Sequence, residues 1–119
     1  ACGCGVGQIV KSLIFVLDPP GEPILVLVSG SNRVQEAGLG ARLEGKLLKA
    51  TAELVQQATG FVIGGVPPLG HAAALPTYLD ADLLQYDVVW AAAGTPHAVF
   101  PVDPRELQRI TEAQVVIVK

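Results

Sequence analysis

The chain has 119 residues, of which 50% are hydrophobic and 16% charged, and this composition predicts one globular domain and excludes intrinsic disorder. The formal net charge is −3, and an acidic balance argues against a protein that coats nucleic-acid duplexes, so we expect no DNA partner. The longest apolar runs, Ser12–Leu17 and Ile24–Val28, are far shorter than the roughly 20 residues of a membrane-spanning helix, so we also expect no membrane partner.

These two apolar runs predict a β-hairpin. Both are rich in β-branched and large apolar residues, and Asp18–Gly21 between them has the composition of a tight turn. The stretch that follows mixes charges with glycines and is ambiguous, and we interpret Gly40–Leu43 within it as a short strand. Half of all lysines and arginines fall in this stretch, which is typical of either a solvated surface or a patch that contacts phosphates; they are Arg33, Arg42, Lys46 and Lys49.

A short helix and a shaped loop follow. Thr51 is a candidate N-cap for a helix over Ala52–Ala58, and Gly60 stands where a C-terminal glycine is expected. Three glycines and two prolines occur within Phe61–His71, which predicts a loop and excludes a strand or helix interior.

The remaining chain predicts three or four short strands and one capped helix. Asp80 is positioned to cap a helical turn over Ala81–Leu84. Asp103 precedes a helix that runs to about Thr111, with Pro104 at its first position and Glu106 in a capping-box arrangement. The strands are expected at Pro76–Asp80, Val88–Ala93, Ala98–Val102 and Gln114–Val118.

Six or seven strands, two clear helices and hairpin spacings favour the α+β class. We expect a single domain over residues 1–119, in which a mixed, largely antiparallel sheet curls or closes into a barrel with flanking helices. No linker or internal repeat is visible.

Two features could carry chemistry, since the usual nucleotide-binding and serine-hydrolase motifs are missing. Lys11 lies inside an apolar run, where it either snorkels at a strand edge or projects into a pocket as a ligand for phosphate or carboxylate. Gly64–His71 is either a tight connection or a backbone cradle for a ligand. The residues alone leave both choices open.

A zinc site is disfavoured, because the spacing of the two cysteines and two histidines matches no known finger pattern. Two reduced cysteines and the absence of a visible secretory signal favour the cytoplasm.

Several motifs, in order along the chain, resemble those of the YbaK family of free-standing aminoacyl-tRNA deacylases, which are related to the editing insertion domain of bacterial prolyl-tRNA synthetase. The motifs are Gln8–Leu13, Ala58–Gly60, Gly64–Gly70, Ala93–Gly94 and Asp103–Leu107. Members usually carry some tens of residues before the lysine motif. The sequence also has no methionine, so we expect this chain to lack the N-terminal segment of the family.

The resemblance implies a trans-editing hydrolase that cleaves the ester of a mischarged aminoacyl-tRNA and needs no cofactor or metal. The expected substrate is tRNA(Pro) carrying a small wrong amino acid such as Ala or Cys. An editing site is useful because a synthetase pocket discriminates a methylene by only about 1–3 kcal/mol. A non-catalytic module that binds tRNA ends or a synthetase is the alternative from another functional class.

The resemblance also implies the site. Lys11 corresponds to the family lysine that holds the tRNA 3′ end, and Gly64 and Gly65 open the loop whose backbone binds the aminoacyl group. We assign these three residues to catalysis. Further substrate-binding candidates are Ser12, Val66, Pro67, Pro68, Gly70, His71, Gly94 and His97. Implied partners are the 3′ end of mischarged aminoacyl-tRNA and, as further candidates, a synthetase or an elongation factor.

Overall fold

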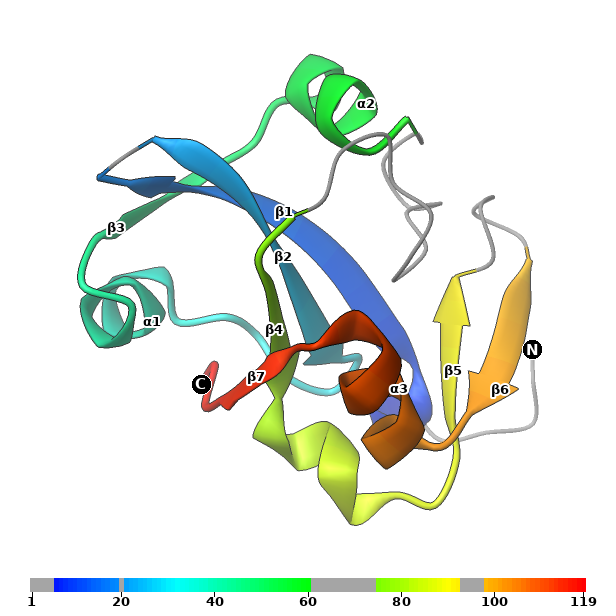
Figure 1. The fold of residues 1–119 in the computed structure, drawn as a ribbon. Helices are drawn as coiled ribbons and strands as arrows, with labels where there is room; N and C mark the ends of the chain where they lie inside the picture. Colours follow the sequence, from blue (N-terminus) through cyan, green and yellow to red (C-terminus); the bar gives the residue numbers. More distant parts are fainter. Residues whose placement is uncertain (1–5, 20, 61–74, 93–97) are drawn as a thin grey trace.

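The computed structural model describes residues 6–19, 21–60, 75–92 and 98–119 (Figure 1). Three α-helices lie within these ranges, α1 (Glu36–Arg42), α2 (Ala52–Thr59) and α3 (Pro104–Thr111), together with two 3-10 turns at Val6–Gln8 and Ala81–Gln85. None of the described helices is long and apolar enough to cross a membrane. The described strands are β1 (Val10–Asp18), β2 (Glu22–Ser29), β3 (Lys46–Lys49), β4 (Thr77–Asp80), β5 (Val89–Ala92), β6 (Val99–Val102) and β7 (Gln114–Val116).

The main sheet has five strands in the order β3-β1-β2-β4-β7. The β1–β2 and β1–β3 pairs are antiparallel, whereas β2–β4 and β4–β7 are parallel. Strands β5 and β6 form a separate antiparallel pair. This arrangement confirms the predicted α+β class with a mixed, curled sheet, and the described strands do not close into a barrel.

The predicted hairpin is confirmed as β1 and β2. Its register pairs Lys11 with Val28 and Ser12 with Leu27, which sends successive β1 side chains to opposite faces of the sheet. The turn between the strands ends at Gly21, whose φ of +91° is a backbone conformation that favours glycine.

The sheet separates two hydrophobic cores. On one face, α1 covers the sheet through the fully buried Leu39, which packs with Phe15 of β1 and Val26 of β2. On the other face, α2, α3 and the β5–β6 pair cover it, and Leu27 of β2 packs there with Leu107 of α3. The large apolar content of the sequence is therefore divided between two layers on either side of one sheet (Figure 1).

The predicted helix caps are present. The Thr51 side chain accepts a hydrogen bond from the Leu54 N–H, and Gly60 ends α2 in the left-handed conformation at φ +80°. The Asp103 carboxylate accepts from the Arg105 N–H at 2.9 Å. The predicted capping box is not seen among the described contacts, because Asp103 accepts from the N–H of the second helical residue instead of the third, and the Glu106 carboxylate pairs with Arg109 on the next turn of α3.

The predicted strand over Gly40–Leu43 is wrong, because Gly40 lies inside helix α1. A Cβ added to Gly40 would stand 2.8 Å from the Gly45 carbonyl oxygen, so only glycine lets the helix approach the backbone that leads into β3 this closely. The glycines that disfavour a helix locally are tolerated here by tertiary packing around the buried Leu39.

Candidate active site

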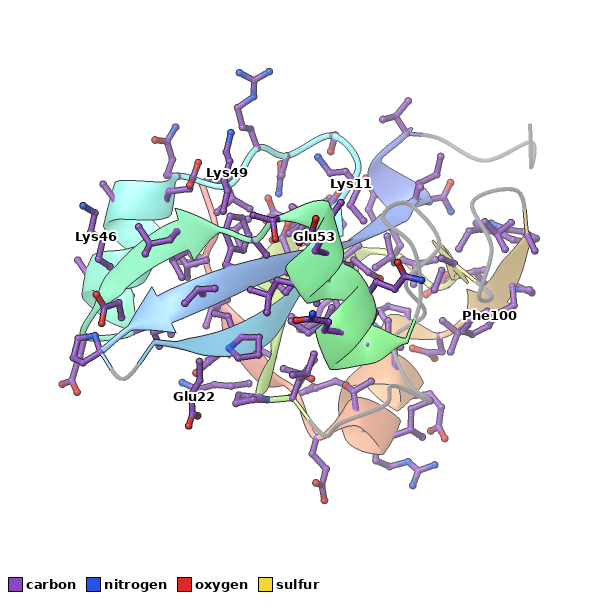
Figure 2. The ribbon with its side chains drawn as sticks, turned by 90° about the horizontal axis from the view of Figure 1, so that it is seen from above. Lys11, Glu22, Lys46, Lys49, Glu53 and Phe100 are labelled. Carbon is purple, nitrogen blue, oxygen red and sulfur yellow. The ribbon has the colours of Figure 1, made fainter. Side chains whose placement is uncertain are left out.

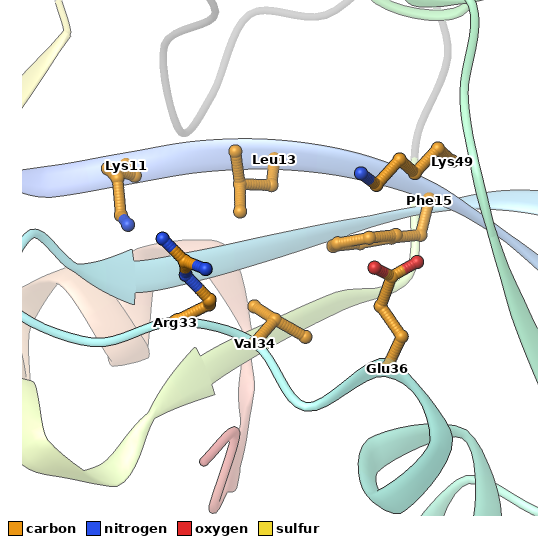
Figure 3. Close-up of a pocket in the computed structure, with 7 residues that line it drawn as sticks. All are labelled: Lys11, Leu13, Phe15, Arg33, Val34, Glu36 and Lys49. Carbon is orange, nitrogen blue, oxygen red and sulfur yellow. The ribbon is translucent and has the colours of Figure 1, made fainter.

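A pocket of about 350 Å³ opens on the α1 face of the sheet, at the end of β1 that carries Lys11 (Figure 3). Strand β1 supplies one wall, the last residue of β3 lies beside it, and the segment that leads into α1 supplies the facing wall. The lining residues are Lys11, Leu13, Phe15, Arg33, Val34, Glu36 and Lys49.

Lys11 is half-buried, and its Nζ donates a hydrogen bond of 2.8 Å to the backbone carbonyl of Asn32. An ammonium group carries three N–H donors, so two remain for a ligand. Because Lys11 pairs with Val28 in the hairpin register, its backbone is fixed by the central strands of the sheet. Lys11 is therefore a positioned cation at a pocket, and its predicted role as a ligand for phosphate or carboxylate stays a prediction.

The pocket has a charged end and a mixed end. Figure 3 shows Lys11 and Arg33 pointing toward one another at one end, and Lys49 with Glu36 at the other, with the ring of Phe15 between them. Figure 2 places Lys11 and Lys49 along one long edge of the molecule and Glu22 at the opposite edge. Three cations and one carboxylate around apolar side chains suit an anionic ligand with a flat apolar part, such as a nucleotide end.

Ser12 lies on the other face of β1 from this pocket. Its register partner Leu27 is part of the core beneath α2 and α3. The Ser12 Oγ is buried and has no hydrogen-bond partner among the described residues. The structure therefore does not bring Ser12 together with Lys11 in this pocket.

The other predicted site residues lie outside the described residues, and their assignment stays a prediction. They are Gly64, Gly65, Val66, Pro67, Pro68, Gly70, His71, Gly94 and His97. Cys2 and Cys4 also lie outside, so the expectation that the chain holds no zinc is likewise untested.

The structure adds residues that the sequence interpretation did not assign to the site. Arg33 and Lys49 come from the cation-rich stretch and line the pocket, whereas Arg42 of the same stretch donates to the Ile117 carbonyl and does not. Lys11 and Phe15 share one face of β1 by alternation, but Lys49 could be placed in the same pocket only once the β1–β3 register, in which Lys49 pairs with Phe15, was known. Asn32 carried no signal in the sequence.

Comparisons with known proteins identify the family to which the chain belongs. The sequence model of the aminoacyl-tRNA editing domain family matches residues 1–110. YwhH of Bacillus subtilis, a protein of uncharacterised function, is 28% identical over 97% of this chain and 73% of its own length. EbsC of Enterococcus faecalis, named as a candidate Cys-tRNA(Pro)/Cys-tRNA(Cys) deacylase, is 26% identical over 94% of this chain and 68% of its own length.

Solved structures show similarity over nearly the whole chain. A crystal structure described as that of a candidate trans-editing enzyme for prolyl-tRNA synthetase superimposes with a TM-score of 0.93 and 52% identity, over 98% of this chain and 73% of that one. The hypothetical protein APE2540 superimposes with a TM-score of 0.88 and 30% identity, over 98% of this chain and 77% of that one.

Proposed function

Because the chain belongs to the aminoacyl-tRNA editing domain family and is an aminoacyl-tRNA deacylase, we propose that it edits in trans tRNA(Pro) carrying a small wrong amino acid such as Ala or Cys. The names of EbsC and of the trans-editing structure support tRNA(Pro) as the tRNA. We place the reaction in the cytoplasm, where charged tRNA is used. A synthetase or an elongation factor that delivers the substrate is a further proposed partner.

The reaction is the hydrolysis of one ester bond. The oxygen of a water molecule attacks the carbonyl carbon of the aminoacyl group, and the carbonyl oxygen becomes an oxyanion. Collapse of this intermediate breaks the bond to the ribose oxygen, which takes up a proton while the amino acid leaves with a new carboxyl group. Donors aimed at the oxyanion accelerate such a reaction most, and an activated aminoacyl ester needs little help from a general base.

The observation that carries the proposal is the position of Lys11. Its ammonium is held at one end of a pocket with Arg33 opposite, and two N–H groups are free of the Asn32 carbonyl. A terminal phosphate or ribose of the tRNA end would receive these donors as charge-assisted hydrogen bonds. Such contacts fix the ester relative to the attacking water, and this positioning supplies rate without a covalent intermediate.

The proposal keeps the backbone role of Gly64–Pro68, which lies outside the described residues. Two adjacent glycines permit approach to the aminoacyl group within hydrogen-bond range, about 3 Å between heavy atoms. We expect Gly64→Ala to lower kcat/KM more than stability, and to lower it most for the bulkier accepted amino acid. Equal losses for two amino acids, in step with the melting temperature, would mark this loop as a structural connection only.

A deacylation panel tests the proposal. Purified protein is incubated with tRNA(Pro) charged with Ala, Cys or Pro, and with tRNA(Ala) and tRNA(Cys) carrying their own amino acids, and the remaining ester is measured over time. We expect fast hydrolysis of Ala-tRNA(Pro) or Cys-tRNA(Pro) and slow hydrolysis of Pro-tRNA(Pro). Binding of these tRNAs without any hydrolysis would instead favour a non-catalytic tRNA-end module.

A further inference from the structure

A buried carboxylate lies behind the turn that holds Lys11. Asp80, the last residue of β4, is only 1% exposed. Its Oδ2 accepts hydrogen bonds from the Ser29 N–H at 3.1 Å and from the Asn32 Nδ2 at 2.8 Å, and its Oδ1 accepts from the Asp82 N–H at 3.0 Å. A buried carboxylate is costly unless it receives several donors, so this set of three is a built arrangement.

Asn32 connects this carboxylate to the pocket. Its side-chain Nδ2 donates to Asp80 and, at 2.8 Å, to the Asp82 Oδ2, while its backbone N–H closes a turn onto the Ser29 carbonyl at 2.9 Å. Its own carbonyl accepts the 2.8 Å hydrogen bond from the Lys11 Nζ. The Asn32 side chain is therefore bound to Asp80, while the Asn32 backbone carbonyl is bound to Lys11.

We propose that Asp80 and Asn32 are positioning residues for the deacylation, which orient the carbonyl that holds the Lys11 ammonium at the pocket. The inference rests on the role of Lys11 in the proposed function. Neither residue lines the pocket, so both act through Lys11.

A plain structural role for Asp80 is the competing explanation, since its Oδ1 also caps the 3-10 turn at Ala81–Gln85. Asp103 offers a matched control. It too is an aspartate N-cap whose Oδ1 accepts from the backbone N–H two residues on, at 2.9 Å, but its described contacts include neither Asn32 nor Lys11. The effect of losing an N-cap can thus be separated from the effect of losing the hydrogen bond between Asp80 and Asn32.

The first measurement needs no substrate. The four lysines are acetylated briefly with an N-hydroxysuccinimide ester, and mass spectrometry follows Lys11, with the exposed Lys46 and Lys49 as internal references. Asn32→Ala keeps the backbone carbonyl that accepts from Lys11 and removes the side-chain hydrogen bonds of Asn32 to Asp80 and Asp82. Asp80→Asn removes the charge of the Asp80 carboxylate at nearly constant side-chain shape. Both are expected to raise the relative acetylation rate of Lys11 about two- to tenfold, the range for losing an ordinary hydrogen bond. Asp103→Asn is expected to leave that rate unchanged.

The second measurement is hydrolysis of mischarged tRNA(Pro). Asn32→Ala and Asp80→Asn are expected to lower kcat/KM about tenfold, because misplacing a catalytic group by about 1 Å can cost up to about a hundredfold. In a Lys11→Ala background the same substitutions should cost almost nothing further, because residues that act through one another are not additive. Asn32→Ala, in a half-buried turn, keeps the test available if Asp80→Asn does not fold.

Unchanged Lys11 acetylation in Asn32→Ala would overturn the proposal, and so would equal losses of kcat/KM with and without Lys11. Wild-type hydrolysis by Lys11→Ala would instead remove the proposed role of Lys11 in the reaction. The acetylation rates would still decide whether Asp80 and Asn32 fix that lysine, so the two failures are distinguishable.

Discussion

Replacing Lys11 with alanine is expected to remove most of the deacylation while the protein stays folded. Among the described residues, the Lys11 side chain makes one hydrogen bond, from its Nζ to the Asn32 carbonyl. This bond lies at a pocket that water can enter. Loss of this bond, whose donor is charged, costs at most about 1.5–3 kcal/mol of the free energy of unfolding, which is less than the roughly 5–15 kcal/mol by which domains are stable. A charge-assisted contact to the tRNA end is worth about 1.5–3 kcal/mol, so kcat/KM should fall about 10- to 150-fold.

The assay measures initial rates of ester hydrolysis over a range of mischarged tRNA(Pro) concentrations, beside a thermal melt of each variant. Lys11→Met keeps most of the length of the unbranched side chain without its charge and should lose as much activity. Lys46→Ala removes an exposed lysine that does not line the pocket and should lose little. A folded Lys11→Ala protein with kcat/KM within about twofold of wild type would refute the reasoning, since a contact of that strength predicts at least a tenfold loss.

Three further outcomes are expected. Gly40→Ala should destabilise the protein by about 1–3 kcal/mol in denaturant titrations, because its Cβ meets the Gly45 carbonyl, whereas Gly38→Ala in the same helix, with its nearest neighbour at 3.8 Å, should be neutral or stabilising. Hydrogen bonds from Lys119 and Asn32 lower the pKa of Asp82 below its ordinary 3.8, so its contribution to stability is complete above that pH and is lost as the pH falls through the lowered value. Lys119→Ala should therefore lose less unfolding free energy than wild type as the pH falls below about 4, and parallel curves for the two proteins would contradict this. Binding of mischarged tRNA should show a shallow salt dependence of only a few phosphates, and Arg33→Ala with Lys49→Ala should flatten it by about 0.7 each; an unchanged slope would exclude both from the interface.

Local signals in the sequence were sufficient for much of the fold. Thr51 and Asp103 cap helices because a side-chain oxygen reaches a nearby backbone N–H, which is a property of adjacent residues. Gly60 adopts the left-handed conformation at the end of α2 for an equally local reason. The hairpin followed from two apolar runs and the turn between them.

Features that depend on distant residues were not predictable in this way. Helix α1 contains Gly38 and Gly40, which lower its intrinsic preference, and it forms because it packs closely on the backbone before β3. The site shows the same division. Lys11 was identifiable as an unusual cation in an apolar run, but the hydrogen bond of Asn32 to Asp80 joins positions far apart in the chain, and only the fold brings them together.

The pairing order of the sheet has a consequence for how the protein acquires activity during folding. The β1–β2 hairpin closes a loop of a few residues, whereas the parallel β2–β4 pair, which includes Leu25 with Thr77, closes a loop of about fifty, and such non-local contacts form more slowly. The hairpin that carries Lys11 is therefore expected to form before the strand that carries Asp80 is in place. During refolding, recovery of deacylation should lag behind recovery of β-structure, because the last strands to pair complete the support for the lysine.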